Sequence, residues 1–215
     1  MINKQPKTTA ATNYGFEVHA TTQNDIEDFA KSIAENGLEW WEFTIYAQAY
    51  DDDATSDFGK LGDPIPVGGA RVALSRDVDV SGVDWLDAFD DHTFDLSMAA
   101  SDLREVLRKD PEWQSKHDNW ILHLAVIDRV DIVVDFRGQG LSKLLVDAIQ
   151  RMFGEALILL VPSDLDERSS IADSAAEPDG PTRTLRSKKN FQSLQKHWKS
   201  VGFRELAGKT MYLPR

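Results

Sequence analysis

Cysteine is absent from the 215-residue chain, so disulfide bonds, thiolate metal sites and a cysteine nucleophile are excluded. Long apolar runs are missing too: stretches such as 156–162 are far too short to cross a bilayer. The first fifteen residues are polar and lack the apolar block of a signal peptide. These absences predict a soluble, cytoplasmic protein that does not enter a membrane.

Basic residues are scarce as well, with 24 Lys and Arg against 36 Asp and Glu and a net charge of −12. This deficit argues against a nucleic-acid partner, for which a basic surface is the first requirement. The charge is uneven: residues 51–118 hold 17 acidic against 7 basic residues, and residues 181–215 hold 9 basic against 1 acidic. Two interpretations follow, a solvated surface that aids solubility, or a basic end for an anionic ligand and an acidic part for a cationic one.

The length fits one domain with a full hydrophobic core, and we predict a polar tail over 1–15 followed by a single domain over 16–215. Periodicity predicts strands at 15–20, 40–50, 67–74, 120–134 and 156–162, and one or two more within 203–213. It predicts helices at 25–38, 83–89, 98–107, 140–153 and 190–201. The second and third strands should form an antiparallel hairpin, and a Ser-, Asp- and Pro-rich stretch predicts a flexible loop at 163–187.

The segment around residues 136–143 gives the main indication of function. In it a strand, a basic and glycine-rich turn and an amphipathic helix follow one another. Gly138 and Gly140 allow a close approach of the backbone to a ligand, and the N–H groups at the helix start favour phosphate. Arg137 and Lys143 add positive charge, so a diphosphate is the natural ligand. A dinucleotide fingerprint would need glycine at position 143, and the P-loop pattern is absent; a plain strand-to-helix turn remains the alternative.

The pattern Arg137-x-x-Gly140-x-Ser142 resembles the pyrophosphate motif of the GNAT acyltransferases, with serine as the last small residue. Ile132 lies five residues before the arginine, where that family has Val or Ile at the end of its fourth strand. The segment 197–203, His-Trp-Lys-Ser-Val-Gly-Phe, resembles the end of a later family helix. Together these features cover residues 120–213.

The resemblance implies an α/β fold, the GNAT fold, with a mixed, V-splayed sheet of about six or seven strands flanked by helices. It also implies acetyl-CoA as co-substrate, held between the fourth and fifth strands, and no metal. The residues expected to bind it are Ile132, Val133, Val134, Arg137, Gly138, Gln139, Gly140, Leu141, Ser142 and Lys143. The basic segment 183–189 either meets the adenosine 3′-phosphate or is a solvated loop.

The activity implied is N-acetyl transfer from acetyl-CoA to a primary amine by direct attack. The family often uses a tyrosine of the last helix to protonate the leaving thiolate, but Trp198 stands at that position, and an indole N–H is no usable acid. Tyr212 is a substitute candidate for the acid, with a packed tyrosine as the alternative.

The fourth strand offers His123, Asp128 and Asp131 as a general base. Strict alternation places Asp128 on the face shared by Val130 and Ile132. His123 and Asp131 fall on the other face. Asp128 is therefore the first candidate; an ion pair, an exposed carboxylate or a chain of waters in place of a base are the alternatives.

An acidic surface would attract a cationic small molecule or a basic peptide as the amine substrate. A homodimer is a further candidate for the assembly. Two other functions compete with the enzyme: a catalytically silent CoA-binding module, favoured by Trp198, and an acidic protein-interaction module that uses residues 51–118.

Overall fold

A computed structural model describes residues 14–22, 38–49, 63–76, 88–89, 92–116, 121, 123–163 and 181–215, with side chains of the last segment from residue 190 onward. The helix expected at 25–38 lies outside these residues except for its last position. Most of the expected polar tail and residues 164–180 of the expected loop lie outside them as well.

Seven strands form one mixed sheet, in the order β1-β2-β3-β4-β5-β7-β6. The strands are β1 (Tyr14–Thr22), β2 (Glu39–Ala49), β3 (Ile65–Ser75), β4 (His123–Ile132), β5 (Ala156–Leu160), β6 (Arg204–Ala207) and β7 (Thr210–Leu213). The β4–β5 pair is parallel and all the other pairs are antiparallel. The predicted mixed sheet, the hairpin of the second and third strands and the two terminal strands are confirmed.

The helices are α4 (Phe94–Lys109), α5 (Trp113–Lys116), α6 (Leu141–Met152) and α8 (Pro181–Val201), with a short 3₁₀ turn η1 (Val134–Phe136). The helix predicted at 98–107 is confirmed within α4, which begins earlier because the Thr93 side chain accepts a hydrogen bond from the N–H of Leu96. Of the segment 83–89, residues 88 and 89 are described, and both are helical and buried.

The predicted loop is wrong over residues 181–187, because α8 begins at Pro181, nine residues before the predicted helix start. Proline fits the first position of a helix, where its missing N–H would have no partner. The helix ends as predicted at Gly202, whose φ of 125° suits glycine.

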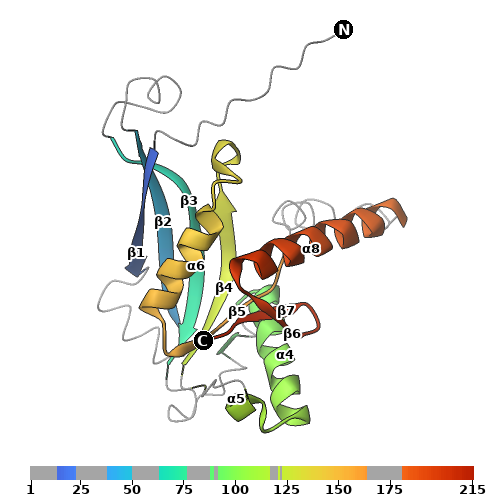
Figure 1. The fold of residues 1–215 in the computed structure, drawn as a ribbon. Helices are drawn as coiled ribbons and strands as arrows, with labels where there is room; N and C mark the ends of the chain where they lie inside the picture. The colour runs from blue at the N-terminus through green and yellow to red at the C-terminus, as the bar shows by residue number, and fades with distance from the viewer. Residues whose placement is uncertain are drawn as a thin grey trace.

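Two apolar clusters lie on opposite faces of the sheet. Helix α6 packs on one face through Leu141, Leu145, Val146 and Ile149, and Trp198 of α8 joins it there. Helix α4 packs on the other face through Leu96, Ala99, Ala100 and Leu103. Figure 1 shows α6 lying across β2, β3 and β4, with α4 beside β6 and β7. Alternation of strand residues supplies apolar side chains to both layers.

The sheet splits between its two parallel strands. Pairing of β4 with β5 ends at Ile127 and Leu160, whereas β4 continues to Ile132 along β3. Beyond Ile127 the far edge of β4 therefore has no strand partner among the described residues. This divergence is the predicted V-shaped splay.

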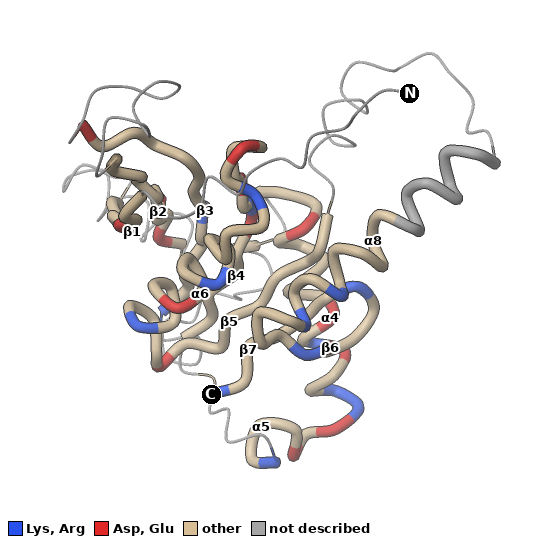
Figure 2. Tube along the Cα trace, turned by 45° about the horizontal axis from the view of Figure 1, so that its top comes forward, with Lys and Arg blue, Asp and Glu red and all other residues tan. Residues whose placement is uncertain are grey.

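Acidic and basic residues of the described chain are distributed over many elements rather than gathered on one (Figure 2). Several form exposed ion pairs, such as Lys199 with Glu205 and Lys143 with Asp147. No helix among the described residues is long and apolar enough to span a membrane.

Candidate functional site at the split of the sheet

A buried aromatic side chain holds the turn after β4 against the sheet. Phe136 is 2% exposed and makes edge-on contacts with Tyr14 and Phe16 of β1, at ring-centroid distances of 5.4 and 6.2 Å. The N–H of Val133 donates to the carbonyl of Val67 on β3 at 2.9 Å. These contacts with distant parts of the chain tie the turn to β1 and β3, and the next two residues, Arg137 and Gly138, are exposed.

The backbone of the turn presents a row of N–H groups. In the described part of the chain, the N–H groups of residues 138–142 form no backbone hydrogen bond, and the ladder resumes at Lys143, which donates to Gly140 at 3.0 Å. Gly138 and Gly140 have φ values of 82° and 79°, a region that favours glycine. A Cβ added at either glycine would meet no atom within 4 Å. The space above these amides is open to an anion.

The two cations predicted near the turn behave differently. The Nε of Arg137 donates to the carbonyl of Ile132 at 3.0 Å, so its side chain folds back along the turn while staying exposed. The Nζ of Lys143 lies 2.9 Å from Asp147, one helical turn along α6. Arg137 is therefore the cation more available to a ligand, and Lys143 shares its charge with a carboxylate.

A cavity of about 850 Å³ extends from this turn to the split of the sheet. Seven of the predicted acetyl-CoA residues line it: Ile132, Arg137, Gly138, Gly140, Leu141, Ser142 and Lys143. Val133, Val134 and Gln139 are not among the lining residues; the first two are 43% and 68% exposed. The Oε1 of Gln139 is buried and has no hydrogen-bond partner among the described residues.

Another part of the cavity lining comes from α8 and from Ser163, just past β5; the sequence pointed to the end of this helix, residues 197–203, but not to Ser163 or to the earlier turns of α8. The residues of this part are Ser163, Asn190, Ser193, Leu194, His197, Trp198, Ser200 and Val201. Trp198 is 8% exposed and packs edge-on against Phe203 at 5.7 Å. The helical spacing of 190, 194, 197 and 201 would have indicated a common face, because these positions repeat every three or four residues.

The prediction that Asp128 shares a face with Val130 and Ile132 is wrong, because β4 has a bulge at this residue. Arg71 of β3 faces Arg129, and the next residue of β3 faces Ile127, so Asp128 is skipped in the pairing. The extra residue reverses the order of the faces. Val130 and Ile132 therefore pack on the α6 face with Ile127, and Asp128 contacts Thr93 at the start of α4.

Asp128 forms an ion pair, which was one of the alternatives to its role as a general base. Its Oδ2 accepts from the Nε of Arg71 at 2.9 Å, and its Oδ1 accepts from the Thr93 hydroxyl at 2.7 Å. The carboxylate is fully buried and is not among the residues that line the cavity. The catalytic base assigned to Asp128 stays a prediction, without the facing argument that supported it.

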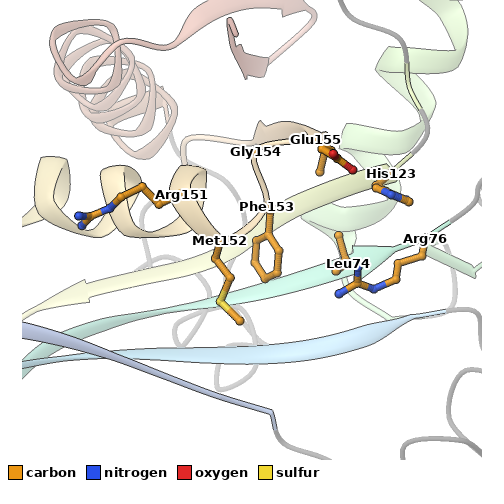
Figure 3. A pocket seen from close by; sticks show the side chains of 9 residues that line it. Leu74, Arg76, His123, Arg151, Met152, Phe153, Gly154 and Glu155 are labelled. Atoms are coloured by element: carbon orange, nitrogen blue, oxygen red, sulfur yellow. The ribbon is translucent and has the colours of Figure 1, made fainter.

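Tyr212 and His123 also lie away from the cavity lining. Tyr212 is 4% exposed and stacks edge-on with Trp113 at 5.3 Å, on the α4 face. His123 begins β4, nine residues before Ile132, which is about 30 Å along a strand. There it lines a separate cavity of about 330 Å³ (Figure 3), in which Arg76 is already paired with Glu39. Asp131 lines the larger cavity and pairs with Arg129.

The first turn of α4 connects the two strands where they separate. Thr93 donates to Asp128 on β4, and the hydroxyl of Ser163, just past β5, donates to Oδ2 of Asp95 at 2.6 Å. Asp95 is 4% exposed. Of the described residues, no group of three or more His, Asp or Glu is arranged to hold a metal ion.

The described structure is thus a mixed α/β fold in which a seven-stranded sheet, flanked by helices, splits beside an open, glycine-containing turn. No protein-family model and no curated protein matches the chain. Three solved structures are similar in outline. The KacTA–DNA complex is 9% identical over 92% of this chain and 93% of that chain, with a TM-score of 0.37. AtaT complexed with acetyl-methionyl-tRNAfMet is 10% identical over 92% and 95%, with a TM-score of 0.34. AtaTR bound with AcCoA is 8% identical over 94% and 93%, with a TM-score of 0.33. A likeness this distant carries no argument about function.

Proposed function

We propose that this chain is an N-acyltransferase that moves an acetyl group from acetyl-CoA to an amine. The observation that carries the proposal is the 850 Å³ cavity, which joins the open amides of residues 138–142 to the unpaired edge of β4. A diphosphate fits the first part, and an extended amide-containing arm fits the second. Acetyl-CoA has both groups, and when bound it supplies the thioester carbonyl and the thiolate leaving group.

The residues present fit this donor. The open space over Gly138 and Gly140 admits phosphate oxygens, and Arg137 lies beside them with an exposed guanidinium. Val130, Asp131 and Ile132 line the middle of the cavity on the strand edge that β5 leaves free. Trp198 closes the α8 side with a buried ring, which shields part of the cavity from water.

A first experiment tests the donor. Calorimetry with acetyl-CoA, CoA and NAD should show micromolar binding of the CoA species and none of NAD. Gly140→Trp should abolish the binding, because the indole would fill the open space over the turn, and Arg137→Glu should weaken it at least tenfold through charge reversal. Gly154→Ala, at the far end of α6 and outside this cavity, is the matched control and should bind as the wild type does.

A second experiment tests turnover with a panel of acceptors: a polyamine, an amino sugar, a basic peptide and an aminoacyl-tRNA. The last is included because AtaT is seen complexed with acetyl-methionyl-tRNAfMet. Acetylation of any member supports the proposal, and acetylation of the aminoacyl-tRNA would overturn the prediction that nucleic acid is no partner. Tight CoA binding without product from any amine would favour the catalytically silent module. Trp198, which stands in place of the usual acid, also favours that module.

A further inference from the structure

Ser163 and Asp95 lie 68 residues apart in the chain and form a hydrogen bond beside the cavity. The hydroxyl of Ser163 donates to Oδ2 of Asp95 at 2.6 Å, a short bond of the kind that a charged acceptor makes. Ser163 is a lining residue of the 850 Å³ cavity, and Asp95 is not. The serine therefore separates a buried carboxylate from the space that the reacting groups would occupy.

The Ser163–Asp95 pair lies where the proposed reaction would take place. Ser163 follows β5, three residues after the pairing of β5 with β4 ends. The carboxylate of Asp95 belongs to the first turn of α4, on the other face of the sheet, where the helix dipole favours its negative charge. The pair thus links the donor cavity to the face that carries α4.

We propose that Ser163 is a catalytic residue that relays a proton to Asp95 while the amine attacks the thioester; this inference rests on the proposed function. The bond from the amine nitrogen to the carbonyl carbon forms, and the bond from that carbon to sulfur breaks. The N–H proton passes to the Oγ of Ser163 as the hydroxyl proton of Ser163 passes to Oδ2 of Asp95. The reverse transfer delivers one proton to the leaving thiolate, so that an amide and CoA form and both residues return to their starting states. Asp95, which acts through the serine, is a positioning residue.

The same helix supplies a matched control pair. Thr210 of β7 donates from its hydroxyl to Oδ2 of Asp102, also at 2.6 Å. Thr210 is 1% exposed, and neither residue lines the cavity. If a hydroxyl–carboxylate bond on α4 has only a structural role, its removal should therefore have the same effect in both pairs.

The test compares Ser163→Ala and Asp95→Asn with Thr210→Val and Asp102→Asn in the full chain. Melting temperature, acetyl-CoA affinity by calorimetry and kcat with the best acceptor are measured for each. We expect kcat to fall about 100-fold in the first two variants, the usual contribution of a proton-transfer group, with the acetyl-CoA affinity within about twofold of wild type. Ser163→Thr, which keeps the hydroxyl, should restore kcat to within about fivefold. The two control variants should lose melting temperature to a similar degree and keep kcat.

Equal kcat in wild type and in folded Ser163→Ala would overturn the inference and leave the acyltransferase proposal intact. A loss of kcat in Ser163→Ala that Ser163→Thr does not restore, or an equal loss in the Asp102 and Thr210 variants, would overturn it as well. If the wild type binds acetyl-CoA and forms no product with any amine, the proposed function fails first, and the inference fails with it. Should Asp95→Asn prove unfolded, the serine variants decide the question alone.

Discussion

Arg71 and Asp128 form an ion pair across the β3–β4 interface, with the guanidinium Nε 2.9 Å from a carboxylate that is fully buried. The Arg71 side chain is 35% exposed, and its Cζ lies 4.7 Å from the ring centroid of Trp40. The hydroxyl of Thr93 donates to the other carboxylate oxygen of Asp128. With both oxygens occupied, Asp128 holds the bulge of β4 and the start of α4 together.

Asp128→Asn should therefore act mainly on stability. Breaking a buried ion pair costs about 3–5 kcal/mol, and partial exposure of Arg71 reduces the expected loss in unfolding free energy to about 1–3 kcal/mol. Urea denaturation measures it. Asp110→Asn, which breaks an exposed pair with Lys116, should cost less than about 1 kcal/mol. If Asp128 were the catalytic base, kcat would drop by about 100-fold in the folded variant, with stability little changed.

Gly140→Ala should weaken acetyl-CoA binding as well as the fold. The φ of 79° costs alanine about 1–2 kcal/mol relative to glycine, and the new methyl group would occupy the open space over the amides. Gly202→Ala, at a φ of 125° and outside the cavity lining, separates the two effects. It should lower the melting temperature similarly and leave the affinity for acetyl-CoA unchanged. Equal affinity in both variants would contradict a phosphate role for the turn.

Arg137→Gln should raise the dissociation constant of acetyl-CoA about tenfold and make binding less dependent on salt, because one phosphate contact with a positive charge is lost. Titration calorimetry at 50 and 500 mM NaCl measures both effects. Arg104→Gln removes an exposed arginine of α4 and is the control, with no expected change. A variant that binds as tightly as wild type at low salt would show that Arg137 does not meet the ligand.

The carboxyl group of Glu105 should titrate at an unusually low pH. Hydrogen bonds from Arg108 and Lys109 lower its pKa from 4.5 to about 2. A lowered pKa in the folded state stabilises the fold above pH 4.5 and loses this contribution as the pH falls through about 2. NMR titration of the side-chain carboxyl carbon should give a midpoint near 2, which moves toward 4.5 in 0.5 M NaCl because the group is exposed. A midpoint of 4.5 at low salt would contradict these ion pairs.

Local signals explain what could be predicted from sequence. Two glycines, a preceding strand rich in β-branched residues and an amphipathic helix surround the turn at 137–142, all within residues 123–152. Its position and its open amides therefore follow from short-range preferences. The individual strands followed from the same kind of signal, whereas the mixed sheet was what the resemblance to the GNAT acyltransferases implied.

Two features of the site are encoded by no local pattern, and one helix start was marked by a local signal that the composition outweighed. One extra residue at Asp128 reverses the facing of the rest of β4, and nothing in the alternation of the sequence marks that residue. The contact between Ser163 and Asp95 depends on how α4 crosses the split of the sheet, a long-range arrangement. The predicted start of α8 is too late because the Ser- and Pro-rich composition before residue 188 favours a loop, although proline suits a helix start.

The central claim is that the amides of residues 138–142 hold the diphosphate of the acyl donor, and an NMR titration of the ¹⁵N-labelled chain tests it most directly. With added CoA, the backbone N–H resonances of Gly138, Gly140 and Ser142 should shift most strongly and move downfield, as amides do when they bond to phosphate. The resonance of Gly208, in the β6–β7 turn, should stay in place. Saturating CoA that leaves the resonances of the 138–142 turn unmoved would contradict the account.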